Sequence, residues 1–287
     1  MGLAIARLSG ARLVFHNEGF YPDEQVDAGI WREGSLPHRA TRSFEQRLYA
    51  GADGIIALSE RGRDAIQARL ASPARDERVI VVPSCVDLET WPLRAHPRRS
   101  AGPPRLVYLG SVGARYGFGF AARFAQSVSA LAGGVRLRIL SPVDPGVVAG
   151  VLSEAGLSRE EWSIASVPHL EVAHELAGQD CGLAFYAPGR ATLGCSPTKV
   201  GEYWASGIPV ATTPGIGDTE KVIRLERVGV IVDADTEESR RVAALELLTL
   251  LADPSTAQRC RKAAERHYSL EVATERQLQL YRQLVSD

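Results

Sequence analysis

The chain has 287 residues, of which 45% are hydrophobic and 23% are charged, a composition typical of a globular protein large enough for two domains. Its formal net charge of -1 includes no strongly basic tail, so bulk charge gives no support to a nucleic-acid-binding function. The four cysteines lie far apart without metal-ligand spacing, which argues against a zinc site and favours a reducing cytoplasm.

Short apolar runs alternate with amphipathic stretches along the whole chain. The runs are ARLVF (11–15), GIIAL (54–58), RVIVV (78–82), RLVYLG (105–110), VRLRIL (135–140), WSIAS (162–166), CGLAFY (181–186), IPVATT (208–213) and VGVIV (228–232). Strands that alternate with helical patterns indicate βαβ units and parallel sheets. We therefore expect an α/β protein.

The stretch RAHPRRSAGPP (94–104) is rich in Pro, Gly and Arg and predicts a linker. It separates a first lobe, residues 1–93, from a second lobe, residues 105–287, which ends in helices from about residue 236. The first lobe has three strand candidates, whereas a doubly wound domain commonly has about five or six. We expect an incomplete N-terminal lobe, and whether Met1 is the native start stays open.

The segment GCSPTKVGEYWASGIPVATTPGIGD (194–218) contains two strand-to-helix turns. In the first, Ser196 is expected to cap a helix and Pro197 to occupy its first position. The start of a helix carries a partial positive charge and unpaired N–H groups, both of which favour phosphate. Lys199 adds a cation in this first turn and is the candidate phosphate ligand.

Glu202 lies on the same predicted helix face as Thr198 and Lys199. A carboxylate there can accept hydrogen bonds from both hydroxyls of a ribose, and the alternative is a solvated ion pair with Lys199. In the second turn, PGIGDTE, Gly215 and Gly217 permit close backbone approach, and Asp218 or Thr219 can cap the next helix. Both helix starts should face one crevice at the carboxyl ends of the strands.

The stretch SPTKVGEYWASGIPVATTPGIGD, with LVYLGSVGARYGF upstream and ADGIIALSERGRDAI and VIVVPSCVD before the linker, resembles family 4 glycosyltransferases of the GT-B fold. Residues 19–54 are similar to a bacterial subgroup that makes surface polysaccharides. The resemblance implies two Rossmann-like lobes and transfer of a sugar, of hexosyltransferase type, from a UDP- or GDP-linked nucleotide-sugar. It further implies a glycan or lipid-linked acceptor, retention of anomeric configuration, and no required metal or other cofactor.

The resemblance also assigns roles to individual residues. Glu202 falls on the position that binds the donor ribose, and Gly110, Ser111 and Arg115 belong to the loop that faces the diphosphate. His169 comes just before a helix near the nucleotide base; a plain helix-start residue is the alternative.

Catalysis would use no protein nucleophile. Arg115 and Lys199 would stabilise the departing phosphates, and His16 falls where many relatives carry a histidine in the crevice. The donor-side set is Gly110, Ser111, His169, Ser196, Pro197, Thr198, Glu202 and Gly217.

Three positions depart from the commoner family pattern. Gly194 replaces a glutamate that contacts the transferred sugar, and Ser111 and Tyr116 replace an arginine and a lysine. Lys199 and Arg115 are expected to supply the missing charge.

Two other functions stay open: a non-catalytic nucleotide-sugar-binding remnant and a sugar-nucleotide epimerase. The lack of an obvious acid/base pair in the crevice argues against the epimerase. Arg39, Arg42 and Arg47 on one predicted helix indicate either a solvated face or weak peripheral contact with a membrane. We expect a cytoplasmic protein, with the inner face of the membrane as the alternative location.

Overall fold

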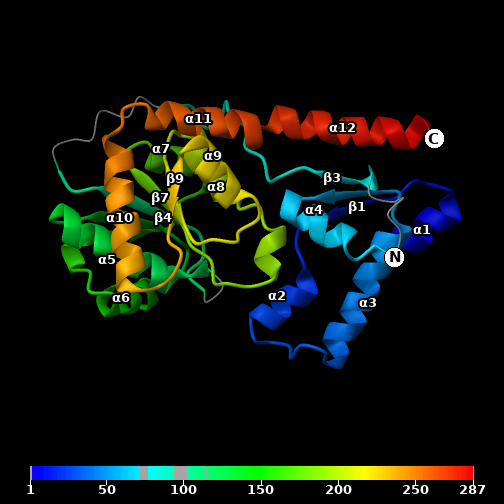
Figure 1. Cartoon of the computed structure of the whole chain (residues 1–287), viewed down its shortest axis with the longest axis horizontal. Coiled ribbons are helices and arrows are strands. Elements are labelled where there is room, and N and C mark those ends of the chain that lie inside the picture. Colours follow the sequence, from blue (N-terminus) through cyan, green and yellow to red (C-terminus); the bar gives the residue numbers. More distant parts are fainter. Residues whose placement is uncertain (1, 71–76, 94–101, 114–115, 287) are drawn as a thin grey trace.

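The computed structural model describes residues 2–70, 77–93, 102–113 and 116–286, which form two α/β lobes (Figure 1). Most of the expected linker and the predicted site residue Arg115 lie outside these residues. Each of the nine predicted strand runs contains a strand, and all the strand pairs are parallel. The predicted α/β class is therefore confirmed.

The first lobe is built on a three-stranded sheet with the order β1-β2-β3 in the described part of the chain. Its strands are β1 (Val14–Asn17), β2 (Gly54–Ala57) and β3 (Val79–Val81), and its helices are α1 (Gly2–Ser9), α2 (Tyr21–Asp27), α3 (Leu36–Gly51) and α4 (Glu60–Gln67). The central strand β2 is buried along its whole length, as expected for a parallel sheet covered on both faces.

The second lobe is built on a six-stranded sheet with the order β6-β5-β4-β7-β8-β9, the order of a doubly wound Rossmann-type domain. Its strands are β4 (Arg105–Leu109), β5 (Arg136–Leu140), β6 (Trp162–Ala165), β7 (Cys181–Ala184), β8 (Val210–Thr212) and β9 (Gly229–Ile231). Its helices are α5 (Phe118–Ala132), α6 (Pro145–Glu154), α7 (His169–Leu176), α8 (Thr198–Ala205), α9 (Thr219–Glu226), α10 (Glu237–Ala252) and α11 (Thr256–His267), with short 3-10 helices η3 (Arg159–Glu161) and η4 (Ala191–Gly194). The strand order reverses between β4 and β7, and ligands of such sheets bind at the carboxyl ends beside this point.

Alternating side chains of β4 divide the core of the second lobe between the two faces of the sheet. Leu106 and Tyr108 pack in the cluster that includes α5, α6 and α10, whereas Val107 packs in the cluster that includes α8 and α11. Helix α8 is almost wholly buried, and its Tyr203 lies directly over Gly182 of β7, where an added Cβ would lie 2.3 Å from the tyrosine ring. This packing holds α8 in position against the sheet, and it therefore also sets the position of Thr198 and Lys199 at the start of the helix.

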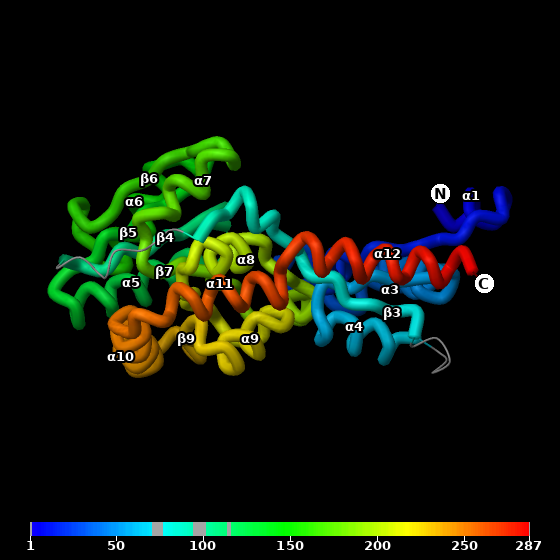
Figure 2. Tube along the Cα trace, turned by 90° about the horizontal axis from the view of Figure 1, so that it is seen from above, coloured from blue at the N-terminus to red at the C-terminus, as the bar shows by residue number. Residues whose placement is uncertain are grey.

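The last helix, α12 (Leu270–Ser286), leaves the second lobe and lies along the first (Figures 1 and 2). Its Ala273 and Leu280 pack with Ile56 of β2 and with Val82 in one apolar cluster. The neighbouring residue Ile55 faces the opposite cluster, with Phe20 and Tyr49. Helix α12 therefore supplies one cover of the first sheet, although the predicted boundaries place it in the second lobe.

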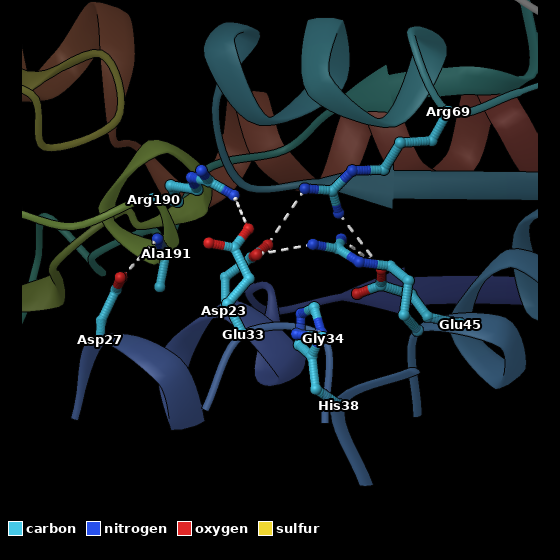
Figure 3. A network of polar contacts seen from close by, with 10 residues as sticks. Asp23, Asp27, Glu33, Gly34, His38, Glu45, Arg69, Arg190 and Ala191 are labelled. Carbon is cyan, nitrogen blue, oxygen red and sulfur yellow. Dashed lines mark hydrogen bonds and ion pairs between the residues drawn. The ribbon is translucent and has the colours of Figure 1, made fainter. Parts of the chain in front are cut away.

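Two acidic and two basic side chains form a closed network inside the first lobe (Figure 3). The Arg42 guanidinium donates to Asp23 (2.6 Å) and Glu45 (3.1 Å), and the Arg69 guanidinium donates to the same two carboxylates at 3.1 and 3.2 Å. Both carboxylates are buried, so the arginines balance charges that would otherwise be costly. Arg42 is therefore committed to this network, which leaves Arg39 and Arg47 as the exposed arginines of the predicted basic face.

Candidate nucleotide-sugar site

The start of α8 differs from the sequence prediction by one position. Pro197 is the N-cap residue and Thr198 is the first helical residue, so Lys199 is the second. The Ser196 hydroxyl, predicted to cap α8, instead accepts a hydrogen bond from the backbone N–H of Ser84 in the segment that leaves the first lobe (3.1 Å). The predicted cap is wrong because this hydroxyl is used in a contact between distant segments of the chain.

Lys199 places a buried cation among aromatic rings. Its Nζ lies 5.1 Å from the ring centre of Tyr108 and 5.5 Å from those of Tyr116 and Tyr186. The negative faces of aromatic rings attract an ammonium at such distances. No hydrogen-bond partner for Nζ is present among the residues that the structure describes.

An ammonium that is buried without a hydrogen-bond acceptor is poorly stabilised. Burial accordingly lowers the pKa of Lys199 to about 8, and the attraction of Glu202 offsets this only in part. An anion that reached Nζ would supply the missing acceptor and favour the charged form.

Gly110 lies next to the lysine at the end of β4. Its backbone has a φ of +114°, and a Cβ added there would lie 3.4 Å from Nζ of Lys199. Glycine is therefore favoured both by the backbone conformation and by the space beside the cation. The loop continues through the exposed Ser111, whose carbonyl accepts a hydrogen bond from the Tyr108 hydroxyl (2.6 Å).

Glu202 lies one turn after Lys199, with 4% of its surface exposed. Burial raises the pKa of its carboxyl, and the interactions with His169 and Lys199 lower it to a smaller extent. This arrangement weakens the solvated-ion-pair alternative, because Glu202 is not at the surface. His169 is exposed at the first position of α7, and its ring packs edge-on against Trp91 at 5.8 Å.

The second glycine-rich turn packs against the first rather than standing free of it. Gly217 has a φ of +42°, and an added Cβ would lie 2.0 Å from the carbonyl oxygen of Cys195. Its N–H donates to the carbonyl of Thr192 at 2.9 Å. Gly217 thus allows the close approach of two loops, which is a structural use of the residue beside its predicted donor-binding role.

His16 lies in the other lobe, on β1, and its side chain is exposed. Its neighbour Asn17 is buried and accepts a hydrogen bond from the Tyr49 hydroxyl (3.1 Å). A role of His16 in the crevice stays a prediction, as does that of Arg115.

The sequence analysis missed the aromatic surroundings of Lys199. Tyr108 is the next-to-last residue of β4, Tyr116 comes after the loop that follows β4, and Tyr186 follows β7, so neighbouring positions in the sequence give no sign of the group. The available signal was topological, because β4 and β7 are neighbours and both end in tyrosine-containing segments. Gly194, the departure from the family pattern, packs between Phe20 (3.0 Å from an added Cβ) and Gly62, so a side chain there would collide with the first lobe.

No group of three or more His, Cys, Asp or Glu side chains is arranged to hold a metal ion in the described part of the chain. Among those same residues, no helix has both the length and the apolar character needed to cross a membrane.

Comparison of the sequence with family models and with curated proteins finds no match. The structure, in contrast, is similar to several solved structures. A sucrose-phosphate synthase from Thermosynechococcus elongatus matches with a TM-score of 0.74 at 18% identity over 99% of this chain and 71% of that chain. HepE from Anabaena, solved with UDP and glucose, matches with a TM-score of 0.70 at 14% identity over 100% of this chain and 74% of its own. WaaG, a glycosyltransferase involved in lipopolysaccharide biosynthesis, matches with a TM-score of 0.67 at 16% identity over 91% and 76% of the two chains.

These structures share two Rossmann-like lobes with this chain. The chain therefore has the GT-B fold, the two-lobed α/β architecture of the glycosyltransferases among them.

Proposed function

We propose that this protein binds a UDP- or GDP-linked nucleotide-sugar at the start of α8 and transfers the sugar to a hydroxyl of a glycan or lipid-linked acceptor. The observation that carries the proposal is the buried Nζ of Lys199, which has no hydrogen-bond partner in the described chain and lies in the first turn of a helix. A helix start and an unpaired cation together favour a phosphate group. The GT-B neighbours, one of them solved with UDP and glucose, support the same class of ligand.

In this proposal each residue contacts a different part of the donor. Lys199 and the first N–H groups of α8 bind the diphosphate, beside the space left by Gly110. Glu202 accepts hydrogen bonds from the ribose, and His169 lies at the base. Ser111, Ser196, Pro197, Thr198 and Gly217 shape the two loops around the phosphates, and Arg115 adds a second cation.

The proposed reaction breaks the bond between the anomeric carbon and the phosphate oxygen and forms a bond from that carbon to the acceptor oxygen. The acceptor proton passes to the departing diphosphate, whose negative charge Lys199 stabilises. Retention of configuration and independence from metal follow from the resemblance of the sequence to family 4. His16, a hexose as the transferred sugar, a location in the cytoplasm and weak peripheral contact with its membrane belong to the same proposal.

Binding of UDP and of uridine by calorimetry tests the site. Glu202→Ala should weaken both ligands by on the order of 1.5 to 3 kcal/mol, because it removes charge-assisted hydrogen bonds to the ribose. Lys199→Ala should weaken UDP but leave uridine nearly unchanged. Lys221→Ala is the matched control, because Lys221 also lies near a helix start but its charge is already paired with Glu60 at 2.5 Å.

Equal losses of UDP and uridine in Lys199→Ala would move the lysine away from the phosphates. Release of UDP or GDP from the nucleotide-sugar that depends on an added acceptor would support the transferase. Tight binding without such release would favour a non-catalytic binding protein, and isomerisation of the donor without an acceptor would favour an epimerase.

A further inference from the structure

Two helices of different lobes begin face to face where the lobes meet. Helix α4 of the first lobe begins at Glu60, and helix α9 of the second lobe follows its N-cap residue Asp218. The sequence predicts that Asp218 or Thr219 caps α9, but the Asp218 side chain makes no cap bond to α9. Instead, the Asp218 carboxylate accepts hydrogen bonds from the backbone N–H groups of Glu60 (2.6 Å) and Arg61 (3.4 Å).

The first turn of α4 needs these acceptors. The first four N–H groups of a helix have no partner within the helix itself. The N–H of Arg63 makes the first bond within the helix, to the Ser59 carbonyl, and the N–H of Gly62 donates to the Ser59 hydroxyl, both at 2.9 Å. The N–H groups of Glu60 and Arg61 donate to Asp218, so the other lobe supplies the acceptor for two N–H groups that the helix itself leaves unpaired.

Further contacts extend the cap to both loops of the candidate site. The Ser59 hydroxyl donates to the carbonyl of Leu193 at 2.6 Å, just before the loop that leads into α8. The Glu60 carboxylate pairs with Lys221 of α9 at 2.5 Å. Asp218 itself directly follows Gly217, whose loop is bonded to Thr192.

We propose that Asp218 is a positioning residue that aligns the first lobe with the nucleotide-sugar loops through a helix cap shared between lobes. The starts of α4 and α9 both carry partial positive charge and would repel each other. The Asp218 carboxylate lies between them and attracts both helix starts. Separation of the lobes would leave two N–H groups and one carboxylate to be solvated by water. The cap therefore favours one alignment of the lobes while allowing it to be reversed.

Hydrogen exchange of individual backbone amides tests this proposal directly. In Asp218→Ala, the amides of Glu60 and Arg61 should exchange about ten-fold faster or more, because each loses a charged acceptor. The amide of Gly62, which is held by Ser59, should change less. Asp218→Asn retains one acceptor oxygen and should restore part of the protection.

Asp144→Ala is the matched control. Asp144 caps its own helix, α6, through a bond from the N–H of Gly146 (2.7 Å) within the second lobe. Its loss should leave exchange at Glu60 and Arg61 unchanged. Unchanged exchange in Asp218→Ala, or equal increases in both variants, would overturn the shared cap.

The effect on turnover rests on the proposed function, whereas the exchange measurement does not. If the protein transfers a sugar, Asp218→Ala should lower kcat while UDP affinity stays within about two-fold, since Lys199 and Glu202 both lie in the second lobe. If Asp218→Ala exchanges faster at Glu60 and Arg61 but keeps its kcat, the cap has no effect on catalysis and the positioning role is overturned. Lack of any turnover in the unmodified protein would instead contradict the proposed function. The exchange measurement would then still show whether Asp218 caps α4.

Discussion

Lys199 combines three properties: a buried side-chain nitrogen, a positive charge and aromatic surroundings. Since the aromatic rings offer no hydrogen-bond acceptor as strong as a carboxylate, the ammonium keeps its affinity for an incoming anion. Glu202, only one turn away, attracts this charge but makes no hydrogen bond with Nζ in the described part of the chain. The pair is better suited to a ligand that carries both hydroxyls and phosphates than to a closed ion pair.

The affinity for UDP should depend on pH through Lys199. The lysine has a pKa of about 8 in the free protein, and a bound diphosphate would raise this pKa. Above about pH 8, the lysine must therefore take up a proton when UDP binds. The affinity for UDP should therefore fall about five-fold between about pH 8 and about pH 9. Calorimetric titration over this range is the measurement, with uridine as the control ligand whose affinity should change little. A flat profile for UDP would contradict contact between the lysine and phosphate.

Among the structural elements, α8 depends on one very close contact with the sheet. Gly182 of β7 lies under the Tyr203 ring, whose hydroxyl accepts a hydrogen bond from the N–H of Leu109 at 3.0 Å. This contact places the start of α8 beside the end of β4. The site thus depends on a glycine that has no contact with the expected ligand.

Gly182→Ala should destabilise the protein by about 1 to 3 kcal/mol, because the added methyl group overlaps the Tyr203 ring. UDP affinity should fall as well, since α8 must shift. Gly150→Ala is the matched control: Gly150 lies within α6 with no atom near the added Cβ, so alanine should stabilise that helix by about 0.5 to 1 kcal/mol. Urea denaturation measures both changes, and destabilisation of similar size in the two variants would contradict the Tyr203 contact.

The strands were predictable from sequence because a buried parallel strand is a short apolar run between turn residues. The glycine-rich turns and the helix after Pro197 were predictable for a similar local reason. The hydrogen bonds of Asp218 and Ser196 were not predictable. Both residues stand where a residue that caps the following helix is expected, but their side chains bond to segments more than 100 positions away. The tyrosines around Lys199 were missed for the same physical reason: their proximity is a property of the strand order and not of any local pattern.

At the scale of the whole molecule, α12 connects the two lobes. It follows α11 of the second lobe and covers the sheet of the first, with Leu280 against Gly54. Its apolar face therefore contributes to the stability of a sheet whose central strand, β2, lies more than 200 residues earlier in the sequence.

Leu280→Ala should lower the free energy of unfolding by about 2 to 5 kcal/mol, because it opens a cavity between α12 and β2. Leu278→Ala on the same helix is the control; Leu278 is 42% exposed, and its loss should cost far less. Thermal unfolding compares the two variants, and amide exchange in β2 would locate the effect in the first lobe. Equal melting temperatures would show that α12 does not stabilise that sheet.

The position of α12 also has a consequence for synthesis of the protein on the ribosome. Domains generally fold as units, the N-terminal one first, as the chain emerges. Here the first lobe emerges before the second, yet Ala273 and Leu280, which cover one face of its sheet, are translated only after the strands of the second lobe. That apolar face must stay uncovered while the whole second lobe is made, so the nascent first lobe is a natural substrate for chaperones until residues 270–286 have left the ribosome.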